Sequence, residues 1–323
     1  MNKKSTSVGI LGGGISGLAT AYYLQKTGCA ATVYEQADSV GGAIKTTRTG
    51  DWLVEEGPNT LMVKSHRIWQ LLEELKLNAK IIEANSLAKR RYIVKNNHPV
   101  PLPDSVLSLL KTPLFSAAAK LRLLKEPFIA ASDEEDESIA SFIRRRLGKD
   151  PLNYAVNPFV SGVYAGTPDE LSVKHTFSAL WELEQQYGSL FKGLLKKERS
   201  KDKPKRALIS FTEGNQLLPN ALAGQLEHPV QTSTAIQSAK FQDQRWQLRA
   251  NQSGRSIQAS HDLVISTLPA YSLADIFGSE FRSLSSIPYA PVSSLALGYR
   301  KDQVQHPLDG FGMLIPAAED YDT

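Results

Sequence analysis

Three glycines near the amino terminus, Gly12, Gly14 and Gly17, form a G-x-G-x-x-G motif between a β-type run and a helix-forming run. In such a turn the first glycine permits the sharp bend, and the second, which has no Cβ, lets a pyrophosphate approach the backbone. The third lets helix and strand pack closely, while free N–H groups at the helix start, around Ile15 and Ser16, face the phosphates. The motif therefore predicts binding of a dinucleotide diphosphate.

A carboxylate stands at the distance from this motif that a dinucleotide site requires. Glu35 follows Gly17 by eighteen residues, at the end of the next β-type run, and can accept both hydroxyls of a ribose. The spacing of Gly12 and Gly17 could also begin the phosphate loop of a nucleotide hydrolase, but Leu18 stands where that motif requires lysine. A tight turn without a ligand is the remaining alternative, and Glu35 argues against it.

The other residue types that could do chemistry indicate no second site. Six histidines, at positions 66, 98, 175, 228, 261 and 306, show no ligand-type spacing with one another or with the single cysteine, Cys29, so we expect no catalytic metal. Cys29 cannot form an intrachain disulfide, which fits a reducing compartment, and its plain interpretation is a small buried hydrophobe. The G-x-S-x-G elbow of many hydrolases is absent from the sequence.

The elements that must position the glycines form a βαβ opening over residues 8–11, 15–26 and 31–35. Prolines then punctuate Leu- and Ala-rich pieces over 99–147, which indicates an inserted helical region, and 175–197 predicts a further amphipathic helix. Acidic residues 133–137 and the basic triplet 144–146 flank one helix and suit its dipole. β character then dominates the runs 207–211, 230–233, 245–250, 257–261, 262–268 and 293–299.

Composition excludes several classes of protein. With 323 residues, 41% hydrophobic and 22% charged, the chain is neither disordered nor fibrous. Residues 192–206 carry eight Lys and Arg against two Asp and Glu, so this stretch is +6 and the rest of the +4 chain is −2. We interpret it as an exposed linker and expect no nucleic-acid partner. Lys3 and Lys4 before an apolar run mimic a signal peptide, but the glycines there weaken that interpretation, and no run reaches the roughly 18 apolar residues of a membrane span.

A second glycine pair follows in Val40-Gly41-Gly42, an arrangement that resembles flavoproteins with two dinucleotide-binding domains and favours FAD over NAD. With its other motifs the chain resembles the oxygen-dependent, FAD-containing protoporphyrinogen oxidases, within the wider amine-oxidase-like flavoproteins. The matching runs are LGGGISGLATAYYL, VGGAIKT, EEGPNTL, KRRYIV, NPFVSGVYAGTPDELSV, DLVISTLPA and GFGMLIP.

The resemblance implies a set of flavin contacts. Thr267 would lie beside the flavin, and Ala235, within 234–236, would lie beside the adenine, although both segments could equally be ordinary sheet core. The family often has arginine where Ala43 stands, so one phosphate contact is expected to be missing. Asn215 stands in a turn where the family has paired glycines, and because it tolerates unusual backbone angles we expect the turn to persist. The remaining expected contacts are Gly12, Gly14, Ile15, Ser16, Gly17, Glu35, Gly41 and Gly42, with Lys45 near the diphosphate and Gly57 beside the isoalloxazine.

A porphyrinogen is a wide apolar macrocycle with two propionates, so its site should be a large apolar cleft holding a few cations. Arg91 resembles the family's arginine that pairs with a propionate, for which a guanidinium presents matched donors. A solvated basic strand end beside Arg90 is the alternative. Gly166 resembles a backbone position against the macrocycle, where a side chain would obstruct it, or it is a plain loop glycine. No catalytic side chain is assigned, because flavin N5 would take the hydride.

The implied architecture is α/β: a Rossmann-like FAD-binding domain in two parts, 1–88 and 207–276, with an inserted region 89–206 and an incomplete α+β substrate domain 277–323. The inserted region would hold the substrate strand and helices associated with a membrane, with 149–169 returning towards the flavin. Those Leu-rich helices could lie on an anionic bilayer or face a core. We expect a cytoplasmic protein, either free or peripheral on the inner face of the cytoplasmic membrane, and either a monomer or a homodimer.

The resemblance implies oxidation of protoporphyrinogen IX to protoporphyrin IX in haem biosynthesis, with dioxygen as acceptor and hydrogen peroxide as product. Family members finish with a Gly-rich loop and helix that return to the flavin, which nothing after Tyr299 contains. We therefore expect the C-terminal part of the fold to be absent, FAD retention to be weak and the isolated chain to be weakly active or inactive. The alternatives are coproporphyrinogen oxidation to coproporphyrin, a related amine oxidase or carotenoid desaturase, and a non-catalytic dinucleotide-binding remnant.

Overall fold

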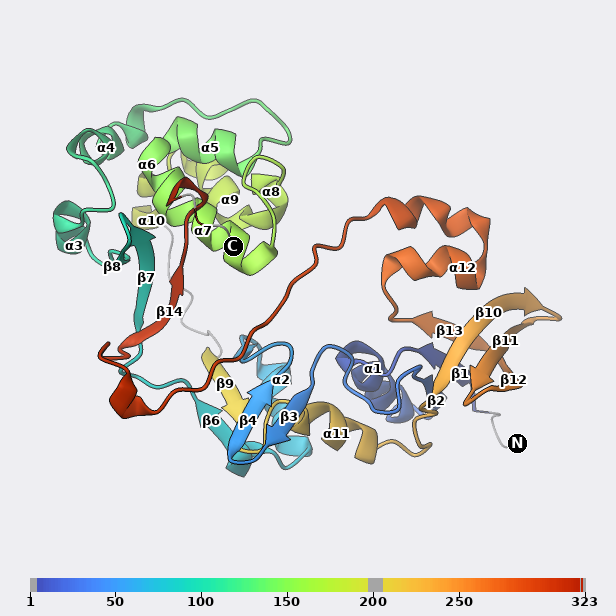
Figure 1. The fold of residues 1–323 in the computed structure, drawn as a ribbon. Coiled ribbons are helices and arrows are strands. Elements are labelled where there is room, and N and C mark those ends of the chain that lie inside the picture. Colours follow the sequence, from blue (N-terminus) through green and yellow to red (C-terminus); the bar gives the residue numbers. More distant parts are fainter. Residues whose placement is uncertain (1–4, 197–205, 320, 322–323) are drawn as a thin grey trace. The chain divides into compact units, whose positions relative to one another are not determined.

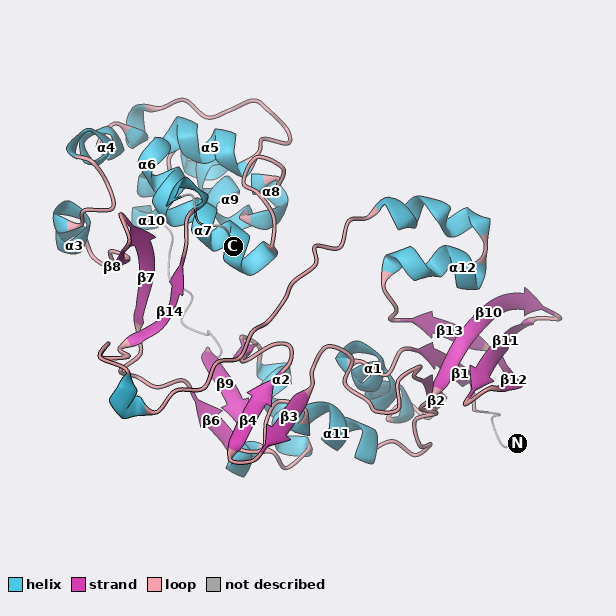
Figure 2. Ribbon diagram, viewed as in Figure 1, coloured by secondary structure: helices cyan, strands magenta, loops and turns pink. Residues whose placement is uncertain are grey.

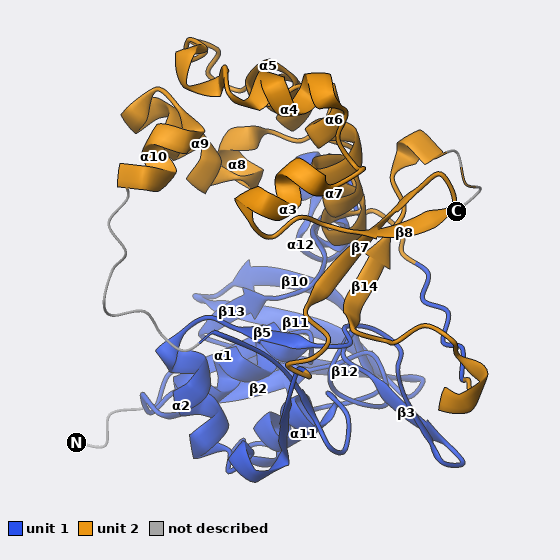
Figure 3. Ribbon diagram, turned by 90° about the vertical axis from the view of Figure 1, so that its left-hand side faces the viewer, with its two compact units in different colours: residues 1–84, 204–289, 293–298 blue, residues 85–203, 290–292, 299–323 orange. Residues whose placement is uncertain are grey.

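The computed structural model describes residues 5–196, 206–319 and 321 of the chain. Two compact units emerge, coloured separately in Figure 3: unit 1 comprises residues 1–84, 204–289 and 293–298, and unit 2 comprises residues 85–203, 290–292 and 299–323. Both units combine helices with small sheets (Figure 2), and the predicted α/β class is confirmed. Most of the basic segment predicted as a linker, 197–205, lies outside the described residues.

The βαβ opening of unit 1 forms as the sequence predicts. Strand β1 (Ser7–Leu11) pairs in parallel with β2 (Ala30–Tyr34) on one side and with β13 (Leu263–Ser266) on the other, and α1 (Ile15–Gln25) connects β1 to β2 (Figure 1). Buried Val, Ile and Ala side chains of β1, β2 and α1 pack together. The three-strand sheet therefore presents the ends of β1, β2 and β13 at one edge, where the glycine turn begins.

An antiparallel sheet follows in the same unit, made of β10 (Thr234–Gln242), β11 (Arg245–Gln252) and β12 (Arg255–His261). The predicted strand over 230–233 is wrong, because regular pairing begins only at Thr234. The preceding segment makes a single parallel bridge, from Gln231 to Tyr34 at the end of β2. This bridge still brings the start of β10 to the edge where β2 ends.

The remainder of unit 1 joins this edge to a second small core. The hairpin β3 (Thr46–Thr49) and β4 (Trp52–Glu55) follows the Gly41-Gly42 loop, and β9 (Ala207–Phe211) pairs with both β5 (Leu61–Val63) and β6 (Ile81–Glu83). Helices α2 (His66–Glu74) and α11 (Leu217–Gly224) pack with α1 on this sheet. Segment 293–299, predicted as a strand, has no regular secondary structure, because it pairs with no strand among the described residues, and Leu295 and Leu297 are exposed.

The described residues of unit 2 form a sheet in which β7 (Arg90–Lys95) lies between β8 (His98–Pro101) and β14 (Gly310–Leu314). One face of β7 is covered, because Ile93 packs with Leu114 and Phe115 in a buried cluster that also includes the partly buried Leu314. Arg91 lies two residues before Ile93, so the strand alternation places it on the same side as this packed face. The strand expected to carry Arg91 in the inserted region is therefore present, as β7.

The helical part of unit 2 consists of short segments. The helix predicted over 175–197 is broken into three pieces, because Phe177 leaves helical geometry and Gly188 ends α9 in the left-handed region at φ +66°. The helices are α3 (Val106–Lys111), α4 (Ala117–Leu123), α5 (Ile139–Arg146), α6 (Lys149–Pro151), α7 (Asn157–Tyr164), α8 (Val173–Thr176), α9 (Ser178–Tyr187) and α10 (Leu190–Lys196), and α12 (Leu273–Phe277) belongs to unit 1.

Buried charges hold these segments together. Arg146 and Glu126 are fully buried, Glu184 is 1% exposed, and the Arg146 guanidinium donates to both carboxylates. Arg145 bridges Glu184 and Glu137 with ion pairs of 2.8 and 2.7 Å. The basic triplet lies in the last turn of α5, where it complements the helix dipole as the sequence predicts, and Arg145 and Arg146 also neutralise interior carboxylates. Among the described helices, none is long and apolar enough to span a membrane.

Candidate flavin and substrate sites

A cavity of about 520 Å³ opens in unit 1 at the edge where β1, β2, β10 and β13 meet. Its polar and backbone surfaces come from the glycine turn and the residues after β2, and its apolar surfaces come from the segments after β13. The lining residues are Leu11, Gly12, Gly14, Ile15, Ser16, Tyr34, Glu35, Gln36, Gly41, Gly42, Ala43, Ile44, Thr234, Ile236, Thr267, Leu268, Pro269, Tyr271, Ser272 and Ile276.

The glycine turn is held by close backbone contacts that only glycine allows. Gly12 adopts φ +105°, and its N–H donates to the carbonyl of Tyr34 at 2.8 Å. A Cβ on Gly17 would lie 1.9 Å from the carbonyl oxygen of Gly12, so Gly17 lets helix α1 approach the turn. At Gly14 the nearest atom to an added Cβ would be Cα of Gly42 at 4.0 Å. Neither the packing around position 14 nor its φ of −70° therefore requires glycine there. The space beside Gly14 is open to a ligand.

Glu35 lies 9% exposed at the end of β2 and is already fixed by the backbone. Its Oε2 accepts from the N–H of Gly13 at 2.6 Å, and its Oε1 accepts from the N–H of Ala37 at 2.8 Å. A carboxylate has about four acceptor sites, so two remain for hydroxyl donors. This geometry fits the ribose-binding role that the spacing predicts, because the carboxylate is oriented before any ligand arrives.

The second glycine pair lies directly against the first turn. The N–H of Gly41 donates to the carbonyl of Gly13 at 2.9 Å, and Gly14 forms a parallel bridge with Gly41. Gly41 and Gly42 have φ of +120° and +61°, values that residues with a side chain rarely adopt. Both loops therefore present backbone to one end of the cavity, where a diphosphate can approach them without meeting a Cβ.

Four of the predicted cofactor residues lie outside the cavity lining. Gly17 packs beneath the turn, and Ala235 lies between two lining residues, Thr234 and Ile236, because strand alternation turns every second side chain inward. Lys45 is exposed, and its carbonyl accepts from the N–H of Glu56 at 2.9 Å. Gly57 packs on the carbonyl of Ala43, where a Cβ would lie 2.0 Å from the oxygen.

Several lining residues carried no sequence signal. Tyr271, Ser272 and Ile276 follow the predicted contact Thr267, and nothing in their spacing indicated a ligand. Tyr34 could have been inferred, because it precedes Glu35 at the end of β2. Its hydroxyl lies 2.9 Å from Nε2 of the buried His261, and burial raises the pKa of Tyr34 above its ordinary value. Burial also lowers the pKa of His261, and the positive charge of Arg245 lowers it further.

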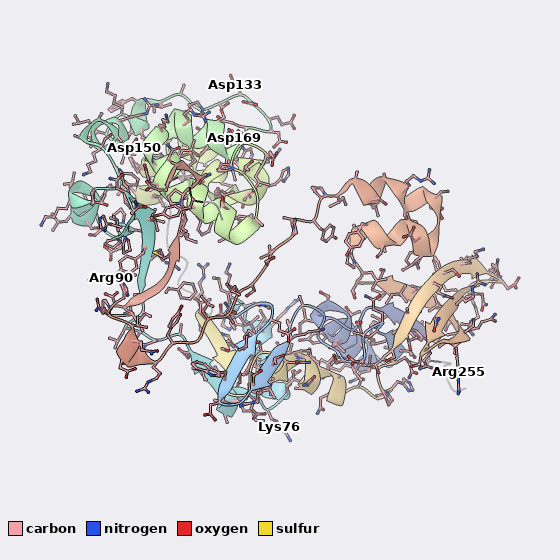
Figure 4. All side chains as sticks on the ribbon, in the orientation of Figure 1. Lys76, Arg90, Asp133, Asp150, Asp169 and Arg255 are labelled. Atoms are coloured by element: carbon pink, nitrogen blue, oxygen red, sulfur yellow. The ribbon has the colours of Figure 1, made fainter. Side chains whose placement is uncertain are left out.

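Both predicted substrate residues belong to unit 2. Arg91 is exposed, its guanidinium carbon lies 5.8 Å from the ring centre of Phe311 in β14, and it has no ion pair with a described carboxylate. Its neighbour Arg90, at the start of β7 in Figure 4, instead pairs with Asp309 at 2.9 Å. That pairing and the hydroxyl of Tyr92 lower the pKa of Asp309, with the hydroxyl as the larger cause. Of the two strand arginines, only Arg91 keeps its guanidinium free for a carboxylate.

Gly166 follows α7, which is preceded by a π-helical turn, Leu152–Val156, of a kind that often marks functional sites. The atoms nearest to a Cβ added at Gly166 belong to the side chain of Leu171, the first at 3.3 Å, which is a tight contact that the end of a leucine side chain can relieve, and the φ of Gly166 is not in the left-handed region. Ala165 before it does adopt a left-handed conformation at φ +49°. The fold of the described chain therefore gives no strong reason for glycine at 166.

Comparison with known proteins places this site in a class. The family described as flavin containing amine oxidoreductases matches residues 15–321, and the chain belongs to this family. It is a flavoprotein oxidoreductase, and its cofactor is FAD. The residues described above fit that cofactor, because a backbone cradle with room at Gly14 and an oriented carboxylate at Glu35 meet in one cavity.

Particular relatives are more specific. The chain is 32% identical to protoporphyrinogen oxidase 2 of Arabidopsis thaliana, over 97% of this chain and 68% of that protein. It is 28% identical to coproporphyrinogen III oxidase of Bacillus subtilis, over 99% of this chain and 72% of that protein. A crystal structure of a protein from Exiguobacterium sp. 255-15 shares the fold with a TM-score of 0.71 and 24% identity. The chain spans only 61% of that structure, and the match covers 84% of this chain.

Proposed function

We propose that this protein oxidises protoporphyrinogen IX to protoporphyrin IX in haem biosynthesis, with dioxygen as the electron acceptor and hydrogen peroxide as the product. The observation that carries the proposal is the similarity, over 97% of the chain, to a relative named protoporphyrinogen oxidase. The relative named coproporphyrinogen III oxidase makes coproporphyrinogen the second candidate substrate. Amine oxidation has weaker support, since putrescine oxidase matches at 19% identity and shares the fold alone.

In this proposal FAD, when bound, supplies the acceptor for the hydride that leaves the porphyrinogen. The residues of the chain bind and orient. The backbone of Gly12, Gly14, Ile15 and Ser16 would hold the diphosphate from one side and that of Gly41 and Gly42 from the other. Glu35 would hold the ribose, the β10 segment around Ala235 the adenine, and Thr267 the flavin side of the cavity. Lys45 and Gly57 lie behind the Gly41-Gly42 loop and would contribute to FAD binding from there.

The substrate would be held by contacts from unit 2. The free guanidinium of Arg91 would pair with a propionate and set the orientation of the macrocycle. Gly166 would let the macrocycle lie against the backbone at a position where the nearest obstacle to an added Cβ is the side chain of Leu171, at 3.3 Å. Three hydrides and three protons leave the porphyrinogen in the whole reaction, and one of the protons comes from a meso carbon by tautomerisation of the substrate. The proposal assigns this proton to no side chain, so orientation and exclusion of water are the expected contributions of the protein.

Porphyrin fluorescence and hydrogen peroxide, measured after addition of protoporphyrinogen IX or coproporphyrinogen III to the FAD-loaded protein, test the proposal. We expect both signals to rise together, with a higher kcat/KM for protoporphyrinogen. Arg91→Ala should raise KM at least tenfold, because a charge-assisted pair is lost. Arg90→Ala is the matched control, since that arginine pairs with Asp309 within the sheet. Absence of both signals with either porphyrinogen, from protein that has bound FAD, would refute the proposed function.

We further propose that the protein is cytoplasmic and contacts an anionic membrane through the helical part of unit 2. Leu121, Leu124 and Phe128 are 65 to 87% exposed at helical spacing, and Lys192 lies 6.0 Å from the ring centre of Phe128. Apolar side chains beside cations suit a bilayer interface. Phe128→Ser with Leu124→Ser should reduce sedimentation with vesicles containing phosphatidylglycerol, whereas Leu87→Ser, which is 77% exposed elsewhere, should not. Equal sedimentation of both variants would contradict the contact.

A further inference from the structure

The turn that joins β9 to α11 reaches both loops behind the cavity of unit 1. Gly214 has φ +93°, and a Cβ there would lie 2.2 Å from Cγ2 of Thr46, so the turn touches the end of the Gly41-Gly42 loop. The expected turn exists, but Gly214 adopts the unusual backbone angle and Asn215 does not. Asn215 must therefore have another role, and its side chain shows which one.

The side chain of Asn215 is 94% buried and connects to the loop after β4. Its Nδ2 donates to the carbonyl of Pro58 at 2.7 Å, and its Oδ1 accepts from the hydroxyl of Ser210 at 3.1 Å. The backbone N–H of Asn215 donates to Oε1 of Glu55 at 2.8 Å. Glu55 in turn accepts from the hydroxyl of Thr46 at 2.8 Å through its second oxygen. Asn215 thus ties the Gly57-Pro58 segment to the turn between β9 and α11.

Gln216 makes the corresponding contacts to the cavity loop itself. Its Oε1 accepts from the backbone N–H of Thr46 at 3.1 Å, and its own backbone N–H donates to the hydroxyl of Thr46 at 3.1 Å. Its Nε2 donates to the carbonyl of Val40 at 3.4 Å. Val40 and Thr46 are the two ends of the segment that contains Gly41 and Gly42. One side chain therefore holds both ends of the loop that lines the cavity.

The two held segments are packed on each other without side chains between them. Gly57 lies against the carbonyl of Ala43, and the N–H of Glu56 donates to the carbonyl of Lys45 at 2.9 Å, which continues the β3–β4 pairing beyond the strands. A shift of Pro58 would therefore displace Ala43, which lines the cavity. A change in the position of the Gly57-Pro58 segment is passed to the cavity loop through backbone contacts, which have little freedom to relax.

We propose that Asn215 and Gln216 form a clamp that sets the position of the flavin-facing loop, so that both are positioning residues for the cofactor. The inference rests on the assignment of the unit 1 cavity to FAD. It gives a reason for Asn215 that backbone conformation does not supply. It also accounts for how a loop of consecutive glycines, which loses more conformational entropy on ordering than other sequences, keeps one arrangement.

Two apolar variants of similar volume test the clamp. Asn215→Leu removes the Pro58 and Ser210 bonds, and Gln216→Met removes the Thr46 and Val40 bonds. Ser210→Ala is the matched control, because it removes one hydrogen bond of Asn215 and leaves the bond to Pro58. The readouts are the rate of FAD dissociation, followed by flavin fluorescence after dilution, the reduction potential of bound FAD, and the Tm of the apoprotein.

We expect both clamp variants to release FAD about tenfold faster than the wild type, since Gln216→Met loses two hydrogen bonds to the loop and Asn215→Leu loses the bond to Pro58, whose segment packs on the loop. The reduction potential of bound FAD should also move, whereas Ser210→Ala should keep the wild-type release rate and potential even where its apoprotein Tm falls. Release rates that follow Tm across all three variants would show a purely structural role and overturn the inference. Failure of the wild type to bind FAD would instead overturn the assignment of the cavity.

Discussion

The two units use their charged and conformationally special residues in opposite ways. In unit 1 one end of the cavity is lined by backbone: Gly12, Gly14 and Gly41 shape it, and the carboxylate of Glu35 is fixed by two N–H groups. In unit 2 the helical part is organised by side-chain charges, with Arg145 and Arg146 among three buried glutamates. The glycines and the fixed carboxylate of unit 1 thus shape its cavity, whereas the charged residues of unit 2 stabilise its own interior.

This contrast teaches where substitutions should be tolerated. Where a cavity is lined by backbone, adding a side chain should weaken ligand binding, even if the fold itself has room for that side chain. Where an interior is held by paired charges, removing one charged side chain should lower stability, because its partner is left buried without a counter-charge. The same kind of experiment, a single substitution with stability and binding measured separately, should therefore give opposite results in the two units.

Removal of Arg146 should have the largest effect. Arg146→Met should lower the free energy of unfolding of the helical part by about 3 to 5 kcal/mol, because Glu126 and Glu184 lose their buried counter-charge. Urea unfolding monitored by circular dichroism measures this. Arg144→Met is the control, since its pair with Asp169 is 3.9 Å long and both side chains are more than half exposed. Wild-type stability of Arg146→Met would mean that the cluster does not organise unit 2.

Addition of a methyl group at Gly14 should weaken FAD binding without unfolding unit 1. The nearest atom to the new Cβ is 4.0 Å away, so the apoprotein Tm should stay near that of the wild type, whereas the Kd for FAD should rise at least tenfold as the methyl group meets the diphosphate. Gly224→Ala, at the end of α11 with open space around it, should change neither quantity. An unchanged Kd in Gly14→Ala would place the diphosphate elsewhere.

The glycine cradle could be predicted from the sequence because its determinants are local. A turn between a strand and a helix, a carboxylate at the end of the next strand and a second glycine pair are all specified within residues 8–42, and the structure assembles them around one cavity. Tertiary contacts escaped prediction. The role of Gln216 depends on Val40 and Thr46, more than 165 residues away in sequence, and no local pattern encodes such a contact.

The ion pairs inside unit 2 could not be predicted for a related reason. A basic triplet at a helix end suits the helix dipole whether or not it is buried, so the local pattern located the triplet without indicating its buried partners. Burial of Arg146 arises from Glu126 and Glu184, which lie 20 and 38 residues from it. The long helix expected over 175–197 failed at Gly188, whose left-handed conformation is decided by the packing of α10 back onto α9.

Lowering the pH should reduce the free energy of unfolding of unit 1, because His261 becomes protonated. Burial and Arg245 hold its pKa below the ordinary value of 6.5, so the unfolded chain binds this proton more readily than the folded one. Its contribution to stability is therefore complete above pH 6.5 and is lost as the pH falls towards the folded pKa. In that window His261→Gln should flatten the fall in unfolding free energy by up to about 1.4 kcal/mol per pH unit. Urea unfolding at pH 5 to 8 measures it, with the exposed His228→Gln as control; equal slopes for both variants would contradict it.

The smallest effect, and the finest test of the contrast, concerns two helix ends in unit 2. Helices α7 and α9 both end in a left-handed residue, Ala165 at φ +49° and Gly188 at φ +66°. Glycine avoids the steric cost of that conformation, so Ala165→Gly should raise the unfolding free energy by about 0.5 kcal/mol, and Gly188→Ala should lower it by about 1 kcal/mol. Urea unfolding gives both values, and kcat/KM for the porphyrinogen is measured alongside. A loss of activity in the more stable Ala165→Gly, with Gly188→Ala unaffected, would mean that the strained alanine beside Gly166 is kept for the substrate, so that unit 2 also uses backbone geometry for binding.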